Sequence, residues 1–286
     1  MTYAIHGATG AQGVPLLARL TQAGKPVVAA VRDTAALRGA PAVAVDNASV
    51  DSLVAAYLDA AGVFIHLPVA SETDRLQYAR NIAQAIARVK PPRVVISTSG
   101  WVVDEPNSPL QSPPESAIST LIREVRQTGV SVAVVAPRLF FENLLLPIVI
   151  GPVKAEGIIR YPLRADYAVS WVSHMDVAAA AERLLLDTSV TGVVGVGQSP
   201  GITGADLAEG FARYLGRPVS FASLEPEAFG EMIAPLFGAG AAAGVVAGYQ
   251  AQAQASANAI AQQTSAQHLL GLTPRTLQQW LAEIAA

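Results

Sequence analysis

The chain has 286 residues, of which 51% are hydrophobic and only 14% are charged, and its formal net charge is −3. This composition excludes a disordered chain, because ample apolar surface is available for a core, and it offers no basic face for nucleic acid. With no cysteine and only four histidines, disulfides are excluded and no metal site is expected. The sequence shows neither a signal peptide nor a run of about 20 apolar residues, so we expect a cytoplasmic protein without a membrane contact.

The first half of the chain is predicted to alternate between strands and helices. Apolar runs predict strands over residues 3–6, 26–31, 43–45, 62–67, 93–98 and 130–136. Helical spacing of apolar residues predicts helices over residues 14–23, 49–58, 73–90 and 114–128. This alternation indicates βαβ units, so we expect an α/β fold with a Rossmann-type, doubly wound parallel sheet.

The pattern becomes irregular after Asn143, where prolines at positions 147, 152 and 162 interrupt short apolar segments. Beyond them we expect a helix from about Asp176, as its N-cap, to Leu186, a strand over 193–196 and a helix over 203–216. The second half is therefore predicted to be a smaller, partly helical region with elements that return to the sheet.

Residues 232–274 contain no Asp, Glu, Lys or Arg and are rich in Ala, Gly and Gln. This composition favours an alanine-rich pair of helices packed on the body. A mobile lid and a subunit interface are also consistent with it, and a homodimer is therefore possible.

A glycine-rich loop lies between the first predicted strand and the first predicted helix. It consists of Gly7, Ala8, Thr9, Gly10, Ala11, Gln12 and Gly13. Glycines permit a tight turn and leave no Cβ between the backbone and a ligand, and the following helix presents unpaired N–H groups to a pyrophosphate. In this βαβ context the loop predicts a dinucleotide site.

The end of the second predicted strand distinguishes the two nicotinamide dinucleotides. NAD-specific folds place Asp or Glu there for the ribose 2′-hydroxyl, whereas this chain has Arg32 followed by Asp33. A guanidinium can bind a 2′-phosphate through charge-assisted hydrogen bonds, so we expect NADPH. Alternatively, Arg32 pairs with Asp33 or lies over the adenine, which would leave both cofactors acceptable.

The motifs GATGAQG, VRD, HLP, STSG, APRLFFEN and the closing LGLTPRTLQQWLAEIAA resemble the NmrA-like atypical short-chain dehydrogenase/reductases over essentially the whole chain. The resemblance implies a cofactor-binding domain over residues 1–150 and a substrate-binding region over 151–286. It also implies cofactor positions at the ends of later strands. These are Asp46 and Asn47 by the adenine, Leu67 and Pro68 under the adenosine ribose, Ser97, Thr98 and Ser99 near the nicotinamide ribose, and Pro137 and Phe140 beside the nicotinamide.

The superfamily's usual proton donor, a Tyr-x-x-x-Lys pair, is missing. The only lysines are Lys25, Lys90 and Lys154, and no tyrosine precedes any of them by four residues. An alkoxide formed from a ketone needs an acid at hand, whereas a hydroquinone anion has a phenol-like pKa near ~10. Quinone and triphenylmethane-dye reductases among the resembling proteins fit this reasoning.

The sequence therefore predicts an NADPH-dependent reductase of quinone-like or other conjugated planar acceptors, a small-molecule partner. Candidates for the acceptor pocket are Trp101, Phe140, Phe141, Asn143 and Tyr161. Two alternatives stay open. One is a dinucleotide-sensing regulatory protein of the NmrA type without turnover. The other is an atypical ketone or imine reductase that uses His174 or a water on Asn143 as its acid.

Overall fold

The structure is a computed structural model that describes residues 2–37, 39 and 41–285. Its sheet strands are β1 (Thr2–His6), β2 (Val27–Val31), β3 (Ala42–Ala44), β4 (Ala60–His66), β5 (Arg93–Ser97), β6 (Ser131–Pro137) and β11 (Gly192–Val196). They pair in parallel in the order β11-β6-β5-β4-β1-β2-β3. The predicted Rossmann-type sheet is confirmed, including the late strand that returns to it.

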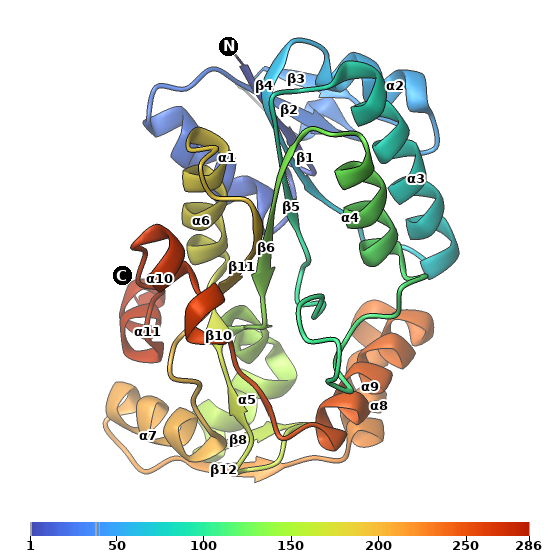
Figure 1. Cartoon of the computed structure of the whole chain (residues 1–286). Helices are drawn as coiled ribbons and strands as arrows, with labels where there is room; N and C mark the ends of the chain where they lie inside the picture. The colour runs from blue at the N-terminus through green and yellow to red at the C-terminus, as the bar shows by residue number, and fades with distance from the viewer. Residues whose placement is uncertain (1, 38, 40, 286) are drawn as a thin grey trace.

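Helices cover both faces of the sheet, as Figure 1 shows. On one face lie α1 (Gly13–Gln22) and α6 (His174–Leu186), and on the other lie α2 (Val50–Tyr57), α3 (Glu72–Val89) and α4 (Ala117–Gln127), while the 3₁₀ turn η1 (Thr34–Ala36) follows β2. Each face has its own apolar core. Val94, Val95 and Ile96 of β5 are fully buried, because central parallel strands are covered on both sides.

The rest of the chain forms the lower part of the molecule in Figure 1, below the carboxyl ends of the strands. Its helices are η2 (Phe141–Leu145), α5 (Pro147–Glu156), α7 (Gly204–Leu215), α8 (Pro226–Phe237), α9 (Ala239–Gln254), η3 (Gln262–Thr264), α10 (Ala266–Leu270) and α11 (Leu277–Ala285). Its short strands are β7 (Leu139–Phe140), β8 (Ile158–Tyr161), β9 (Ala168–Val169), β10 (Trp171–Val172), β12 (Ser220–Ser223) and β13 (Ala257–Asn258). A third core holds this part together. A domain boundary at residue 150 stays a prediction.

Two local features differ from the sequence-based expectation. Helix α5 was not predicted. It begins at Pro147, at a position where an N–H would have no intrahelical acceptor, and it tolerates Pro152 inside. Helix α6 begins earlier than predicted, because Ser173 is its N-cap and Asp176 completes a capping box from the third helical position. The predicted N-cap role of Asp176 was therefore wrong.

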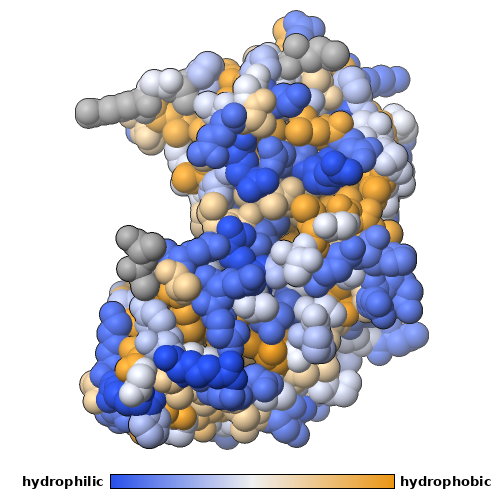
Figure 2. All heavy atoms as spheres, turned by 90° about the vertical axis from the view of Figure 1, so that its left-hand side faces the viewer, coloured by the Kyte–Doolittle hydropathy of each residue, from blue (hydrophilic) through white to orange (hydrophobic). Residues whose placement is uncertain are grey.

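The uncharged stretch after Met232 forms the expected pair of helices, since α8 and α9 pack against each other. Only Ala242 and Tyr249 of α9 are buried. In Figure 2 the molecule narrows between the upper and lower parts, and hydrophilic and hydrophobic residues are mixed over that face. Within the described part of the chain, none of the helices combines the length and the apolar character that a membrane span requires.

Candidate functional site

A pocket of about 380 Å³ opens at the carboxyl ends of β1, β2 and β4. All the strands are parallel, but the order in which they are connected reverses between β1 and β4. Open α/β sheets bind ligands at such a point. The pocket is lined by His6, Gly7, Thr9, Gly10, Ala11, Gln12, Ala30, Val31, Arg32, Val45, Asn47, His66, Leu67, Pro68, Val69 and Ser99. Most of the predicted cofactor residues are therefore gathered around one hollow.

The glycine loop has the geometry of a phosphate cradle. Gly7 has a φ of 76°, in the left-handed region that favours glycine. A Cβ on Gly13 would overlap the carbonyl oxygen of Gly7, so only glycine lets α1 lie this close to β1. A Cβ on Gly7 would lie 2.7 Å from Nε2 of His66. Side chains at these two positions would therefore collide with the loop backbone and with the ring of His66.

Gln12 ties the glycine loop to the end of β5. Its Nε2 donates to Oγ of Ser99 at 2.9 Å, and its Oε1 accepts from Oγ of Ser97 at 2.5 Å. Ser99 has a φ of 54°, and its N–H donates to Oγ of Ser97 at 3.2 Å. Gln12 is the N-cap residue of α1, yet among the described residues its side chain bonds these serines rather than the helix N–H groups. The side chain of Gln12 thus leaves the start of α1 uncapped, although the N–H of Val14 already donates to the carbonyl oxygen of Gly10 at 3.0 Å and Pro15 has no N–H.

Arg32 lies directly after β2, is exposed and lines the pocket. Asp33 does not pair with it in the part of the chain that the structure describes, since its Oδ1 accepts from the N–H of Ala35 at 2.9 Å and caps η1. The guanidinium is therefore available to an anionic group at the mouth of the pocket. Of the alternatives for Arg32, the ion pair with Asp33 is not formed.

The ends of β3 and β4 form the opposite wall. Asn47 is 8% exposed, and its Oδ1 is buried with no hydrogen-bond partner in the described residues. Asp46 is exposed and turned away, with its Oδ1 accepting from the N–H of Ala48 at 2.9 Å. Leu67 and Pro68 line the pocket as predicted. Asn47, Leu67 and Pro68 therefore give this wall both polar and apolar surface.

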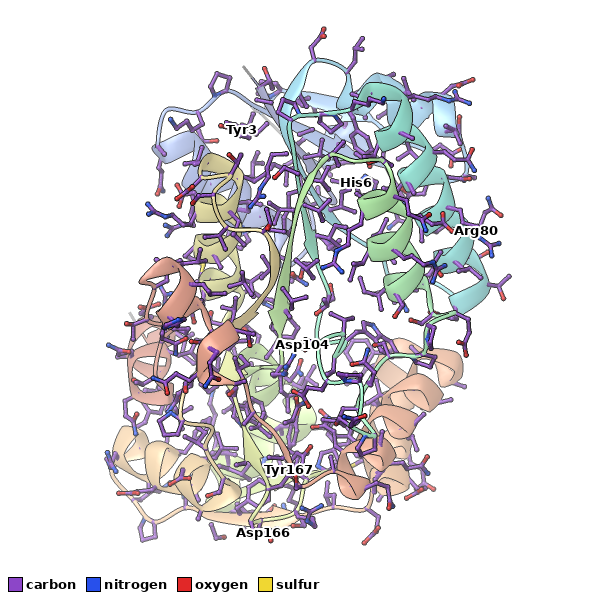
Figure 3. All side chains as sticks on the ribbon, in the orientation of Figure 1. Tyr3, His6, Arg80, Asp104, Asp166 and Tyr167 are labelled. Atoms are coloured by element: carbon purple, nitrogen blue, oxygen red, sulfur yellow. The ribbon has the colours of Figure 1, made fainter. Side chains whose placement is uncertain are left out.

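The two histidines of this region are held neutral. A hydrogen bond of 2.7 Å joins Nδ1 of His6, labelled in Figure 3, to the hydroxyl of Tyr57. Burial, then the nearby His66, lowers the pKa of His6 to about 3. Burial also lowers the pKa of His66. The carbonyl oxygen of Gly7, 3.4 Å from Nε2 of His66, acts in the opposite direction and raises that pKa. Both rings therefore serve as neutral hydrogen-bonding groups at neutral pH.

The far end of the candidate site lies beyond β5 and β6. Ser97, Thr98 and Pro137 are buried, and Oγ1 of Thr98 has no partner among the described residues. Phe140 is half-buried and lies against His174, with ring centroids 4.4 Å apart. Trp101 is 43% exposed, and the guanidinium of Arg75 lies 5.4 Å from its ring centroid. These residues form an aromatic and polar border beside the turn that holds Ser99.

Two predicted acceptor-pocket residues belong instead to the third core. Phe141 is fully buried and stacks between Trp171 and Trp280 at centroid distances of 5.9 and 5.2 Å. Tyr161 is also fully buried, with its hydroxyl 2.7 Å from that of Tyr249. Burial raises the pKa of Tyr161 to about 12. Neither side chain reaches a surface that an acceptor could touch, which corrects their assignment.

Asn143, the remaining predicted acceptor residue, lies in η2 and is half-buried. Several contributors to the region were not singled out as site residues from the sequence, among them His6, Ala30, Val31 and Val45 of the pocket lining. His66 and Val69 line the pocket, and Val69 is 96% exposed at its mouth. Glu142 holds His174 from η2. The HLP motif led to Leu67 and Pro68, which lie between His66 and Val69. The direction of the Glu142 side chain is evident only from the fold.

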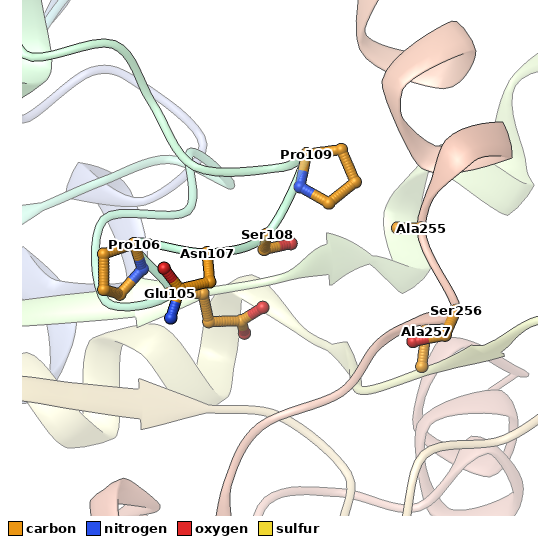
Figure 4. Close-up of a pocket in the computed structure, with 8 residues that line it drawn as sticks. All are labelled: Glu105, Pro106, Asn107, Ser108, Pro109, Ala255, Ser256 and Ala257. Carbon is orange, nitrogen blue, oxygen red and sulfur yellow. The ribbon is translucent and has the colours of Figure 1, made fainter.

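A second hollow of about 370 Å³ lies between the segment after β5 and the segment after α9, as Figure 4 shows. Glu105 lines it and shares the buried guanidinium of Arg138 with Asp104, at 2.9 and 3.0 Å from Nη2. Figure 3 places Asp104 between the sheet and the lower part that contains Tyr167. This second hollow shares no lining residue with the first pocket.

The sheet is parallel, a glycine loop follows β1, and the pocket lies where the strand order reverses. These features define a Rossmann-type α/β protein of the dinucleotide-binding class. A sequence model of the NmrA-like family matches residues 1–281, and the chain therefore belongs to the NmrA-like family. No curated protein sequence matches the chain.

Several solved structures have similar folds. Triphenylmethane reductase from Citrobacter sp., complexed with NADP(H), is 17% identical with a TM-score of 0.81 over 99% of each chain. NADPH-dependent quinone oxidoreductase from Escherichia coli, complexed with NADPH, is 17% identical with a TM-score of 0.78 over 100% of each chain. A mutant form of NmrA is 19% identical with a TM-score of 0.63 over 78% of this chain and 74% of its own. At these identities the likeness shows the shared fold.

Proposed function

We propose that this protein is an NADPH-dependent reductase that passes hydride to a quinone-like or other conjugated, planar acceptor. The observation that carries the proposal is that one pocket gathers the glycine loop, Asn47 and Arg32, which has no ion-pair partner among the described residues. The residues fit a dinucleotide, because Gly7 and Gly13 allow the loop, α1 and His66 to pack closely, and the loop before α1 lines the pocket. NADPH and NADP(H) in two structures of the same fold support this choice.

Each group has a part in holding the cofactor. The glycine loop and the N-terminus of α1 would bind the pyrophosphate, Arg32 the 2′-phosphate, and Asn47, Leu67 and Pro68 the adenosine. The serines at the end of β5 would bind the nicotinamide ribose, and Phe140 would border the ring. A reduced nicotinamide bound in this way supplies the hydride. Orientation of a flat acceptor against it accounts for much of the catalysis expected of such a site.

The acceptor class follows from what α4 lacks. This helix, which would carry the Tyr-x-x-x-Lys pair, contains neither tyrosine nor lysine. A simple ketone would become an alkoxide with no strong acid beside it, whereas a conjugated acceptor spreads the negative charge and needs only a weak acid. The exposed Trp101 and the half-buried Phe140 and Asn143 are the residues that we propose for the acceptor side.

The same absence of a Tyr–Lys pair favours a second candidate, a dinucleotide-sensing protein without turnover. The two are separated by mixing the protein with NADPH and a panel of quinones, triphenylmethane dyes and simple ketones, and following the absorbance of the reduced nicotinamide. Oxidation with quinones but not with simple ketones is the expected result. Tight NADPH binding without oxidation across the panel would favour the sensor, and a preference between NADP⁺ and NADPH would then be required of it.

A further inference from the structure

A carboxylate from one element fixes the imidazole at the start of another. Oε1 of Glu142, in η2, accepts from Oγ of Ser173 at 2.7 Å and from the backbone N–H of His174 at 3.1 Å. Its Oε2 lies 3.5 Å from Nδ1 of His174 and is buried with no hydrogen-bond partner among the described residues. The carboxylate can thus accept from Nδ1–H, which leaves Nε2 free to exchange a proton with something else.

The imidazole faces the end of the site where the acceptor is proposed to lie. Its ring lies 4.4 Å from that of Phe140 at an interplanar angle of 34°. Phe140 in turn lies beside the turn after Ser99, since a Cβ on Gly100 would be 3.9 Å from its Cε2. The side chain of His174 is 20% exposed, so a ligand can reach it. Helix α6, which His174 begins, packs beside α1 and starts at the same edge of the sheet.

We propose that His174 is the proton donor of the reduction and that Glu142 is the residue that positions it. This inference rests on the proposed function, because a proton donor is needed only if hydride is transferred. The sequence offered His174 as an acid only for the alternative ketone or imine reductase, and helix capping was otherwise its simpler interpretation. The carboxylate on Nδ1 and the aromatic ring beside the imidazole are what capping alone does not explain.

Hydride transfer adds two electrons and one proton to the acceptor and leaves an anionic oxygen on it. The Nε2–H bond of the His174 imidazolium breaks, an O–H bond forms on the acceptor, and the neutral imidazole then takes a proton from water. One proton from solvent is consumed for each hydride transferred, and no other reactant is required.

The charges around the imidazole fix the pH dependence. Burial lowers the pKa of His174, and the carboxylate of Glu142 opposes that shift. His66, from the end of β4, lies close enough for the two rings to disfavour each other's protonation. Asp176 on α6 is neutralised by Arg275, whose Nη1 lies 2.6 Å from its Oδ1. The protonated, donating form of His174 therefore declines as pH rises through a pKa below the usual 6.5 of histidine.

The test combines NMR titration with single-turnover kinetics. The chain has only four histidines, so the His174 resonance is identified by its loss in His174→Gln. In the protein without cofactor, Glu142→Gln should lower the pKa of His174, because it removes the opposing negative charge. In the presence of NADPH and a quinone, the wild-type rate should fall with rising pH. His174→Gln should abolish that dependence and slow the reaction about 10²-fold below the break.

A matched control removes a helix cap without touching the imidazole. Thr203 caps α7 in the same capping-box arrangement that Ser173 and Asp176 make on α6, so Thr203→Ala should lower the midpoint of urea unfolding and leave the pH profile unchanged. If His174→Gln keeps the wild-type rate and pH profile, His174 is not the donor. If Glu142→Gln leaves the pKa of His174 where it was, the positioning role fails. If the wild type itself oxidises no NADPH with any acceptor, the proposed reductase function fails, and the donor with it.

Discussion

The side-chain amide of Gln12 donates a 2.9 Å hydrogen bond to the hydroxyl of Ser99, 87 residues further along the chain. This bond, with the second one to Ser97, joins the loop proposed for the pyrophosphate to the turn proposed for the nicotinamide ribose. The two ends of the candidate cofactor site are therefore fixed relative to each other by one side chain. Such a link limits the freedom that a bound dinucleotide would have to remove.

Gln12→Ala removes both hydrogen bonds and leaves the hydroxyls of Ser97 and Ser99 without this partner. A side-chain hydrogen bond contributes about 1 kcal/mol, so NADPH should bind about tenfold more weakly. Isothermal titration calorimetry measures the change. Gln77→Ala is the control, since it removes a comparable 2.8 Å amide bond to Asn81 on α3, outside the pocket. Equal affinities for wild type and Gln12→Ala would show that the bridge does not organise the site.

Arg32→Ala tests the choice of cofactor. The guanidinium is unpaired at the mouth of the pocket among the described residues, and bonds to a charged group contribute about 1.5–3 kcal/mol. The Kd for NADPH should therefore rise about 10- to 100-fold, while the Kd for NADH changes little. Arg88→Ala, which breaks an exposed ion pair with Asp51, serves as the control. A parallel loss of affinity for both dinucleotides would mean that Arg32 does not bind the 2′-phosphate.

Gly13→Ala tests the contact between α1 and β1. The added methyl group would overlap the backbone of Gly7, and overpacking of this kind costs about 1–3 kcal/mol. Urea unfolding should show that loss, and NADPH binding should weaken because the helix N-terminus is displaced. Gly244→Ala on α9 is the matched control. Its Cβ meets nothing within 4 Å, so a stability gain of up to about 1 kcal/mol is expected. A stable Gly13→Ala variant with normal binding would refute the cradle geometry.

Three histidines at or near the candidate site, His6, His66 and His174, predict that stability falls in mild acid. Burial lowers the pKa of His6 to about 3 and also lowers the pKa values of His66 and His174. Between those values and the usual 6.5 the unfolded chain binds more protons than the folded one. The free energy of unfolding is therefore highest above pH ~6.5 and falls below it, by up to about 1.4 kcal/mol per pH unit for each proton.

Urea unfolding at about pH 7 and about pH 5 measures this dependence. His66→Gln should make this dependence shallower, because it removes one of the rings whose pKa burial lowers. Stability that does not fall between these two pH values would contradict the assignment of the three rings as neutral groups.

Much of the fold could be predicted because its signals are local. The apolar run over residues 93–98 predicts a strand, and the glycine loop predicts the turn into α1. The short parallel pairings of the lower part, such as β8 with β12, could not be predicted, because they join segments about 60 residues apart without a repeating pattern. Helix α5 was missed because proline is a helix breaker except at the first turn, and that exception depends on where the helix starts.

In the candidate site too, some residues could be placed from the sequence and others could not. Positions that follow strands, such as Arg32 and Asn47, are brought together by topology and could be placed from the sequence. Phe141 could not be separated from Phe140 in this way. Adjacent residues point in different directions, and only the stacking on Trp280, from the last helix, shows that Phe141 faces the core. Glu142 was missed because its partner His174 is 32 residues away.

The most direct test of the reductase proposal is a single turnover without oxygen. Stoichiometric NADPH is bound to the wild-type protein, a quinone is added, and the absorbance of the reduced nicotinamide is followed. We predict complete oxidation at a rate well above that of NADPH and quinone alone, and a smaller rate when NADH replaces NADPH. Tightly bound NADPH that is oxidised no faster than in free solution would contradict the proposal and identify the protein as a binder of the dinucleotide only.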